Sequence, residues 1–170
     1  MVLSAAELIS ALQNEVRILL HLAGKVEPRM LDYRPTPTQR STLELLQYLA
    51  IMGPTQIAVI KNGIFDRPSL SAAWSPAEAA AKKMSFDQAV AANAALREAY
   101  AQLSTWSDAD FRFEIDMFGS KSSRGAMLVN QVLAGHAAYR TQLFCYLKSC
   151  GLDALGTVNL WAGVDRMAAP

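Results

Sequence analysis

Apolar residues recur at helical spacing in four long stretches of the chain. We expect helices over residues 5–23, 41–62, 85–103 and 124–150. Ser4, Ser85 and Ser123 stand where they can cap a first turn, and Ser41 with Glu44 forms a capping box. The glycines at 24, 63 and 151 follow the stretches and mark their ends. Four amphipathic helices with little β signal are typical of an all-α four-helix bundle.

The segments between these helices are long. Residues 24–40 contain three prolines and should be extended. Residues 64–83 predict a loop with a short helix after Ser75-Pro76. Residues 111–117 alternate apolar and charged side chains as a strand does. A lone strand has no partner, so we expect an extended connection that lays its phenylalanines on the bundle. The bundle therefore needs long crossover connections.

One domain covers residues 1–170, because this length suits a single hydrophobic core. The tail, residues 152–170, is apolar at Leu155 and Leu160-Trp161. We expect the tail to dock on the bundle or on a dimer partner. Because 52% of the residues are hydrophobic, a single bundle would leave part of its apolar surface exposed to solvent. A symmetric homodimer is therefore predicted.

Composition and charge exclude several classes of protein. Only 18% of the residues are charged and the formal net charge is +1, which excludes a disordered chain and disfavours nucleic-acid binding. The charge-free run Leu45 to Ile60 is shorter than the roughly 20 residues that a membrane span needs. Cys145 and Cys150 point apart on one helix and cannot form a disulfide, which suits a reducing compartment. These features predict a cytoplasmic protein with no membrane segment.

Two segments carry a resemblance to a known family. They read RPTPTQRSTLELLQYLA and GHAAYRTQLFCYLKSCG. These segments resemble the second and last helices of the DinB-like superfamily. The best-matching positions are Ser41, Glu44, Leu49, Arg140, Gln142, Leu143, Tyr146, Leu147 and Gly151. The resemblance implies a DinB-like four-helix bundle. In that family three histidines bind a divalent metal, and members of known activity are mostly thiol-dependent transferases or isomerases.

The resemblance places Tyr48, Gly135 and Tyr139 at the three ligand positions, and none is a histidine. The whole chain has two histidines, His21 and His136, so one subunit cannot supply three. We therefore predict that the metal triad is lost and that the chain holds no metal or other cofactor. The alternative is a divalent metal such as zinc or nickel, held by both histidines and one acid if the three converge.

Five residues form the candidate pocket: Tyr48, Asn93, Gly135, His136 and Tyr139. His136 is either a general base or displaced ligand, or a histidine hydrogen-bonded within the core. The two tyrosines either line a polar pocket or fill the space of the former metal site. In the second case the ring of Tyr48 would occupy the space beside Gly135, and its hydroxyl would need His136 or Asn93 as a partner.

These alternatives lead to two functions. The first is a non-metal small-molecule-binding or structural protein with a degenerate metal site. The second is a transferase or hydrolase, metal-dependent or metal-free, that acts on a small, thiol-bearing substrate.

Overall fold

The four long helices begin and end close to the residues that the caps predict. The structure is a computed structural model that describes residues 3–165. The first three are α1 (Ala5–Ala23), α2 (Thr42–Asn62) and α4 (Phe86–Ala101). The fourth runs without a break through α6 (Arg124–Met127), the π-helical segment η3 (Leu128–Leu133) and α7 (Ala134–Ser149). Capping boxes are present at the starts of α1, α2 and α4, as the serines predict.

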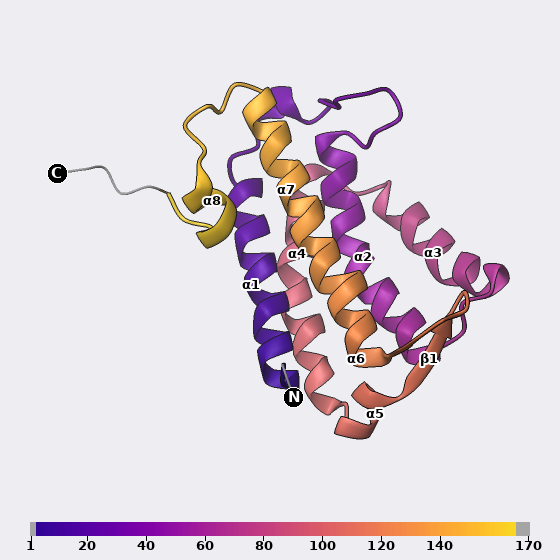
Figure 1. Cartoon of the computed structure of the whole chain (residues 1–170). Coiled ribbons are helices and arrows are strands. Elements are labelled where there is room, and N and C mark those ends of the chain that lie inside the picture. The colour runs from indigo at the N-terminus through magenta and orange to yellow at the C-terminus, as the bar shows by residue number, and fades with distance from the viewer. Residues whose placement is uncertain (1–2, 166–170) are drawn as a thin grey trace.

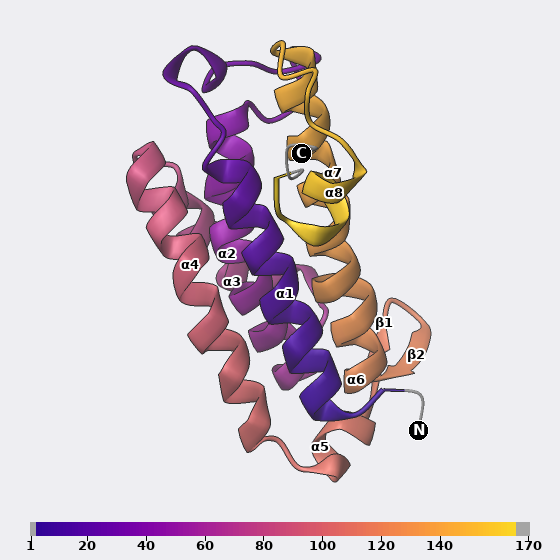
Figure 2. The same cartoon turned by 90° about the vertical axis from the view of Figure 1, so that its left-hand side faces the viewer.

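The helices form a four-cornered bundle (Figures 1 and 2). α1 packs against α4 and α7, and α2 packs against the same two helices. α1 and α2 therefore occupy opposite corners, as do α4 and α7. The chain crosses the bundle twice, from α1 to α2 and from α4 to the last long helix. Each crossing needs a long connection, so the predicted crossovers are confirmed. The first connection contains the short η1 helix (Pro28–Met30) and the last contains η2 (Gln102–Thr105) and α5 (Asp108–Arg112).

The short helix predicted after Ser75-Pro76 is present, but the prediction of a loop over the rest of residues 64–83 is wrong. This segment forms α3 (Arg67–Ala81), which packs on the outer side of α2 (Figure 1). The Asp66 carboxylate accepts a hydrogen bond from the Ser69 amide and caps the helix, while Pro68 lies in the first turn, where its missing N–H costs nothing. The alanines that follow have the highest helix propensity, and the helix continues through Pro76.

The prediction of an unpaired extended segment is also wrong. β1 (Glu114–Met117) pairs antiparallel with β2 (Ser120–Ser123), whose polar sequence gives no strand pattern. The hairpin turns at Phe118 and Gly119, which both have positive φ angles of 56° and 86°. Phe111 packs against the core, but Phe113 and Phe118 are 56% and 76% exposed, so these two phenylalanines do not cover the bundle.

The core consists of two clusters, one at each end of the bundle. The cluster near the start of α1 includes Leu12, Tyr100 and Leu128, and the other includes Leu22, Leu45 and Leu143. α2 contributes to both clusters. By length and composition α2 is apolar enough to cross a membrane, and half of its most apolar stretch is buried inside the protein. A core helix of a bundle has the same properties.

The tail up to Asp165 lies on the chain's own bundle. Its helix α8 (Thr157–Ala162) packs against α1 and α7. The buried Arg140 guanidinium donates to the Glu15 carboxylate (Nε to Oε2, 2.6 Å) and to the Leu160 carbonyl. One side chain thus ties α7, α1 and α8 together. Residues 166–170 of the predicted tail lie outside the described residues.

Candidate functional site

The rings of Tyr48 and Tyr139 meet between α2 and α7, with centroids 5.1 Å apart and planes inclined by 69°. Trp74 of α3 stacks on Tyr48 at a centroid distance of 6.0 Å. The Arg40 guanidinium carbon lies 3.8 Å from the centroid of the Tyr48 ring. These four residues, called the aromatic cluster below, bring together two helices of the bundle, the outer helix and the loop before α2.

Residues that carry the family resemblance hold this loop in place. The Tyr146 hydroxyl donates to the Arg40 carbonyl over 3.0 Å, and the Gln142 amide donates to the same hydroxyl. Immediately after Arg40, the capping box of Ser41 and Glu44 starts α2. The backbone of Arg40 is therefore fixed from both sides, which places its side chain over Tyr48.

A groove of about 620 Å³ opens beside the aromatic cluster. Its lining includes Arg34, Arg40, Glu44, Tyr48, Glu78 and Lys82. Arg34 forms an ion pair with Glu44 (3.2 Å). Within residues 3–165, neither Arg40 nor Lys82 forms an ion pair. The groove is thus lined by Tyr48 and by two cations without an ion-pair partner among residues 3–165.

Tyr48 remains a neutral phenol at physiological pH. Burial raises its pKa above the ordinary value, and its interactions with Tyr139 raise it further, while Arg40 opposes the shift only in part. The hydroxyl therefore has little tendency to ionise, and Tyr139 is its polar neighbour.

Tyr48 is not the partner of the remaining predicted pocket residues, Gly135, Asn93 and His136. A Cβ built on Gly135 would lie 3.3 Å from Cε and 3.4 Å from Sδ of Met52, so a methionine occupies that space, not the Tyr48 ring. Asn93 is buried and donates to the carbonyls of Leu46 (2.9 Å) and Ala89 (2.8 Å). The expectation that Asn93 or His136 binds the Tyr48 hydroxyl is therefore wrong.

His136 lies inside the core and is only 1% exposed. Its Nε2 atom hydrogen-bonds to the Tyr100 hydroxyl from α4, and its Nδ1 has no partner among the described residues. His136 lies about 100° around the helix axis from Gly135, so it points toward Tyr100 of α4, whereas Gly135 faces Met52 of α2. Burial lowers the pKa of His136 to about 4 and raises the pKa of Tyr100. Tyr100 fits only because Gly53 has no side chain: a Cβ there would lie 1.8 Å from the hydroxyl.

At the three positions that the resemblance assigns to metal ligands, the side chains present do not suit a divalent metal. Two are phenols, of which Tyr48 stays protonated, and at Gly135 the nearest side chain is the Met52 thioether, a ligand for soft metals. His21 hydrogen-bonds Asn159 (3.1 Å), whereas His136 hydrogen-bonds Tyr100, so the two histidines have different partners. No three His, Cys, Asp or Glu side chains group as a metal site within residues 3–165.

A solved structure shares this architecture. The crystal structure of the DinB-like protein YjoA from Bacillus subtilis matches this chain with a TM-score of 0.62 at 18% sequence identity. The match covers 85% of this chain and 92% of the other. The chain has a DinB-like fold. No protein-family model matches the sequence, and no curated protein does. The DinB-like four-helix architecture inferred from the two segments is therefore confirmed.

Proposed function

We propose that this protein binds a small organic anion in the groove beside Tyr48, without a metal ion. The observation that carries the proposal is the Arg40 guanidinium, whose central carbon lies 3.8 Å from the centroid of the Tyr48 ring and which forms no ion pair with any described residue. A guanidinium presents a planar set of donors that matches a carboxylate or phosphate. The contact with the Tyr48 ring already restrains the Arg40 side chain, so less side-chain entropy is lost when a ligand binds.

The groove supplies the remaining contacts. Lys82 offers a second cation, and Asp32 and Glu78, which form no ion pair within residues 3–165, can accept hydrogen bonds from hydroxyl or amino groups of the ligand. Leu43 and Ile51 add apolar surface. The volume of about 620 Å³ falls in the range of roughly 300–1,000 Å³ that small-molecule sites have. His136 does not support an enzymatic function, because its side chain is buried in the core and hydrogen-bonds Tyr100.

Nitrogen-15 NMR titration with 4-hydroxybenzoate and adipate tests the binding. We expect saturable shifts at the amides of residues 40–48 and 78–82. Arg40→Gln should weaken binding about tenfold, which corresponds to the loss of one charge-assisted contact. Arg67→Gln, an exposed arginine of α3 outside the groove, should leave it unchanged. Absence of saturable shifts, or equal binding by both variants, would reject the proposal.

Elemental analysis tests the metal-free part separately. Protein purified without a histidine tag should contain far less than one zinc, nickel or iron atom per chain. About one metal atom per chain, lost on His136→Ala, would overturn this part and favour the metal-dependent transferase or hydrolase.

A further inference from the structure

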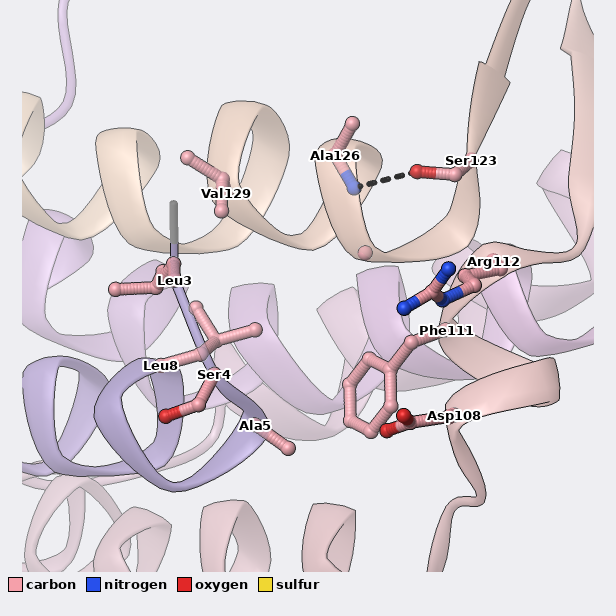
Figure 3. A pocket seen from close by; sticks show the side chains of 11 residues that line it. Leu3, Ser4, Ala5, Leu8, Asp108, Phe111, Arg112, Ser123, Ala126 and Val129 are labelled. Carbon is pink, nitrogen blue, oxygen red and sulfur yellow. Dashed lines mark hydrogen bonds between the residues drawn. The ribbon is translucent and has the colours of Figure 1, made fainter. Parts of the chain in front are cut away.

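A second pocket lies at the opposite end of the bundle, where α1 begins (Figure 3). It has a volume of about 540 Å³, large enough for a small molecule. The first turn of α1, α5 and the start of the last long helix form its walls. None of its residues belongs to the groove beside Tyr48, so a ligand in this pocket would be independent of the proposed function.

Small residues on the last helix leave this space open. A Cβ on Gly125 would lie 3.2 Å from the Phe111 carbonyl oxygen, so a side chain there would push α5 away by a few tenths of an ångström. Ala126 follows with a single methyl group, and Leu3, Leu8 and Val129 complete an apolar wall. In Figure 3 these three apolar side chains lie at the end of the pocket away from α5.

Two opposite charges stand at the α5 end. Asp108 and Arg112 are one helical turn apart, and Figure 3 shows the carboxylate and the guanidinium on either side of the Phe111 ring. Neither side chain forms an ion pair or hydrogen bond with any residue from 3 to 165. Their neighbour Asp110 already has partners. Its carboxylate accepts a hydrogen bond from the Ser107 hydroxyl and lies 3.9 Å from the Arg124 guanidinium. Asp108 and Arg112 are the charged residues that line this pocket, and neither is engaged by another residue from 3 to 165.

We propose that this pocket binds a small zwitterion with an apolar side chain, which is the chemistry of a free hydrophobic amino acid. The carboxylate pairs with Arg112, whose planar guanidinium can bind both oxygens. The ammonium group pairs with Asp108. The apolar side chain extends past Phe111 to Leu8 and Val129, where it leaves water. A ligand with only one of the three parts leaves a charge or an apolar wall without a partner.

The fluorescence of Trp106 tests the proposal, because its ring lies 5.5 Å from that of Phe111. In the variant Trp74→Phe/Trp161→Phe it is the one remaining tryptophan, and the probe is L-leucine, which does not absorb. We expect a saturable change. Arg112→Gln and Asp108→Asn should each weaken binding about tenfold. Arg97→Gln, an exposed arginine of α4 outside the pocket, should bind as the parent does.

Ligand analogues and a filled pocket complete the test. 4-Methylpentanoate lacks the ammonium group and isoamylamine lacks the carboxylate, so both should bind at least about tenfold more weakly than L-leucine. Ala126→Leu should abolish binding while circular dichroism shows unchanged helix content. No saturation up to about 10 mM L-leucine, or undiminished binding by Arg112→Gln, would overturn the proposal. Equal binding of 4-methylpentanoate would overturn the zwitterion in favour of a simple carboxylate.

Discussion

The buried imidazole of His136 makes the stability of the protein depend on pH. Its pKa is about 4 in the folded chain and near 6.5 in the unfolded chain. The unfolded chain therefore takes up a proton first as the pH falls. The free energy of unfolding is highest above pH 6.5 and decreases between about pH 6.5 and pH 4. The loss should approach roughly 3 kcal/mol, since one pKa unit corresponds to about 1.4 kcal/mol.

Urea unfolding between about pH 7 and pH 4 measures this loss. The control is His136→Gln, which has no imidazole at this position and should lose markedly less stability over the same interval. If both proteins lose the same amount, other groups cause the pH dependence and the prediction fails.

The contact between Gly53 and Tyr100 predicts a specific non-additivity. Gly53→Ala should cost about 1–3 kcal/mol through overpacking, offset in part by the better helix propensity of alanine. Tyr100→Phe removes the oxygen with which the new methyl group collides and should cost about 1 kcal/mol for the lost hydrogen bond to His136. In the double variant the cost of Gly53→Ala should be smaller. A double-mutant cycle from urea unfolding checks this, and additive costs would contradict it.

At the residue scale, the sequence predicted some partners and missed others. Helical spacing places Tyr48 and Tyr139 on facing stripes, and the structure brings their rings together. Arg40 and Trp74 were missed because both lie in segments that were expected to be loops. The partner of His136 was missed because spacing along one helix does not fix how far that helix is rotated against its neighbours.

At the scale of elements, the buried Arg140 guanidinium pairs with Glu15 of α1 and is one of the contacts that attach α8. Arg140→Met should cost about 3–5 kcal/mol, because it leaves a largely buried carboxylate without a partner. Arg140→Met/Glu15→Met should cost less than the single change. Urea unfolding measures both costs, and faster hydrogen exchange at the amides of α8 should accompany the single change.

The exposed Arg29–Glu27 pair provides a matched control. It has the same 2.6 Å separation, but both side chains are about half or more exposed to solvent. Arg29→Met should therefore change the free energy of unfolding by no more than about 1 kcal/mol. Equal costs for Arg29→Met and Arg140→Met would show that burial does not determine the contribution of the buried pair.

The hairpin turn contains a residue that is poorly suited to its backbone conformation. Phe118 has a φ of 56°, which asparagine adopts more readily. Phe118→Asn should stabilise the protein by about 0.5–1 kcal/mol, even though the contact with Phe65 is lost. Phe113→Asn is the control, since Phe113 has a φ of −56° and should gain nothing. Thermal melts compare the two, and an equal effect of both would contradict the prediction.

The errors in predicting elements have physical causes. The four long helices bury an apolar stripe, and each begins after a serine cap. Both signals are visible in the sequence. α3 has a mostly exposed alanine-rich surface, buries only Ala81 fully and contains Pro68 and Pro76, which favour a loop. β2 is polar throughout, and its pairing with β1 is set by the turn at Phe118 and Gly119. Elements that bury little leave little pattern in the sequence.

At the scale of the whole molecule, the homodimer remains a prediction. α8 and the residues after it expose Val158, Trp161 and Val164, with Trp161 69% exposed. We expect light scattering at high micromolar concentration to give twice the mass of the 18.5 kDa chain. Trp161→Glu should shift the protein to the mass of one chain, because a carboxylate in an apolar interface is costly. A one-chain mass for the parent protein would contradict the prediction.

The ion pair between Glu15 and Arg140 joins residues that are 125 positions apart. Ribosomes add roughly 5–20 residues per second, so Glu15 is synthesised on the order of ten seconds before its partner exists. During that interval α1 can pack against α4, but the sides that will meet α7 and α8 remain uncovered. Because α7 is made after the other long helices, the nascent chain must keep apolar surface exposed until α7 has been synthesised. In a cell, a chaperone that covers α1 at this stage would therefore protect the newborn protein from aggregation.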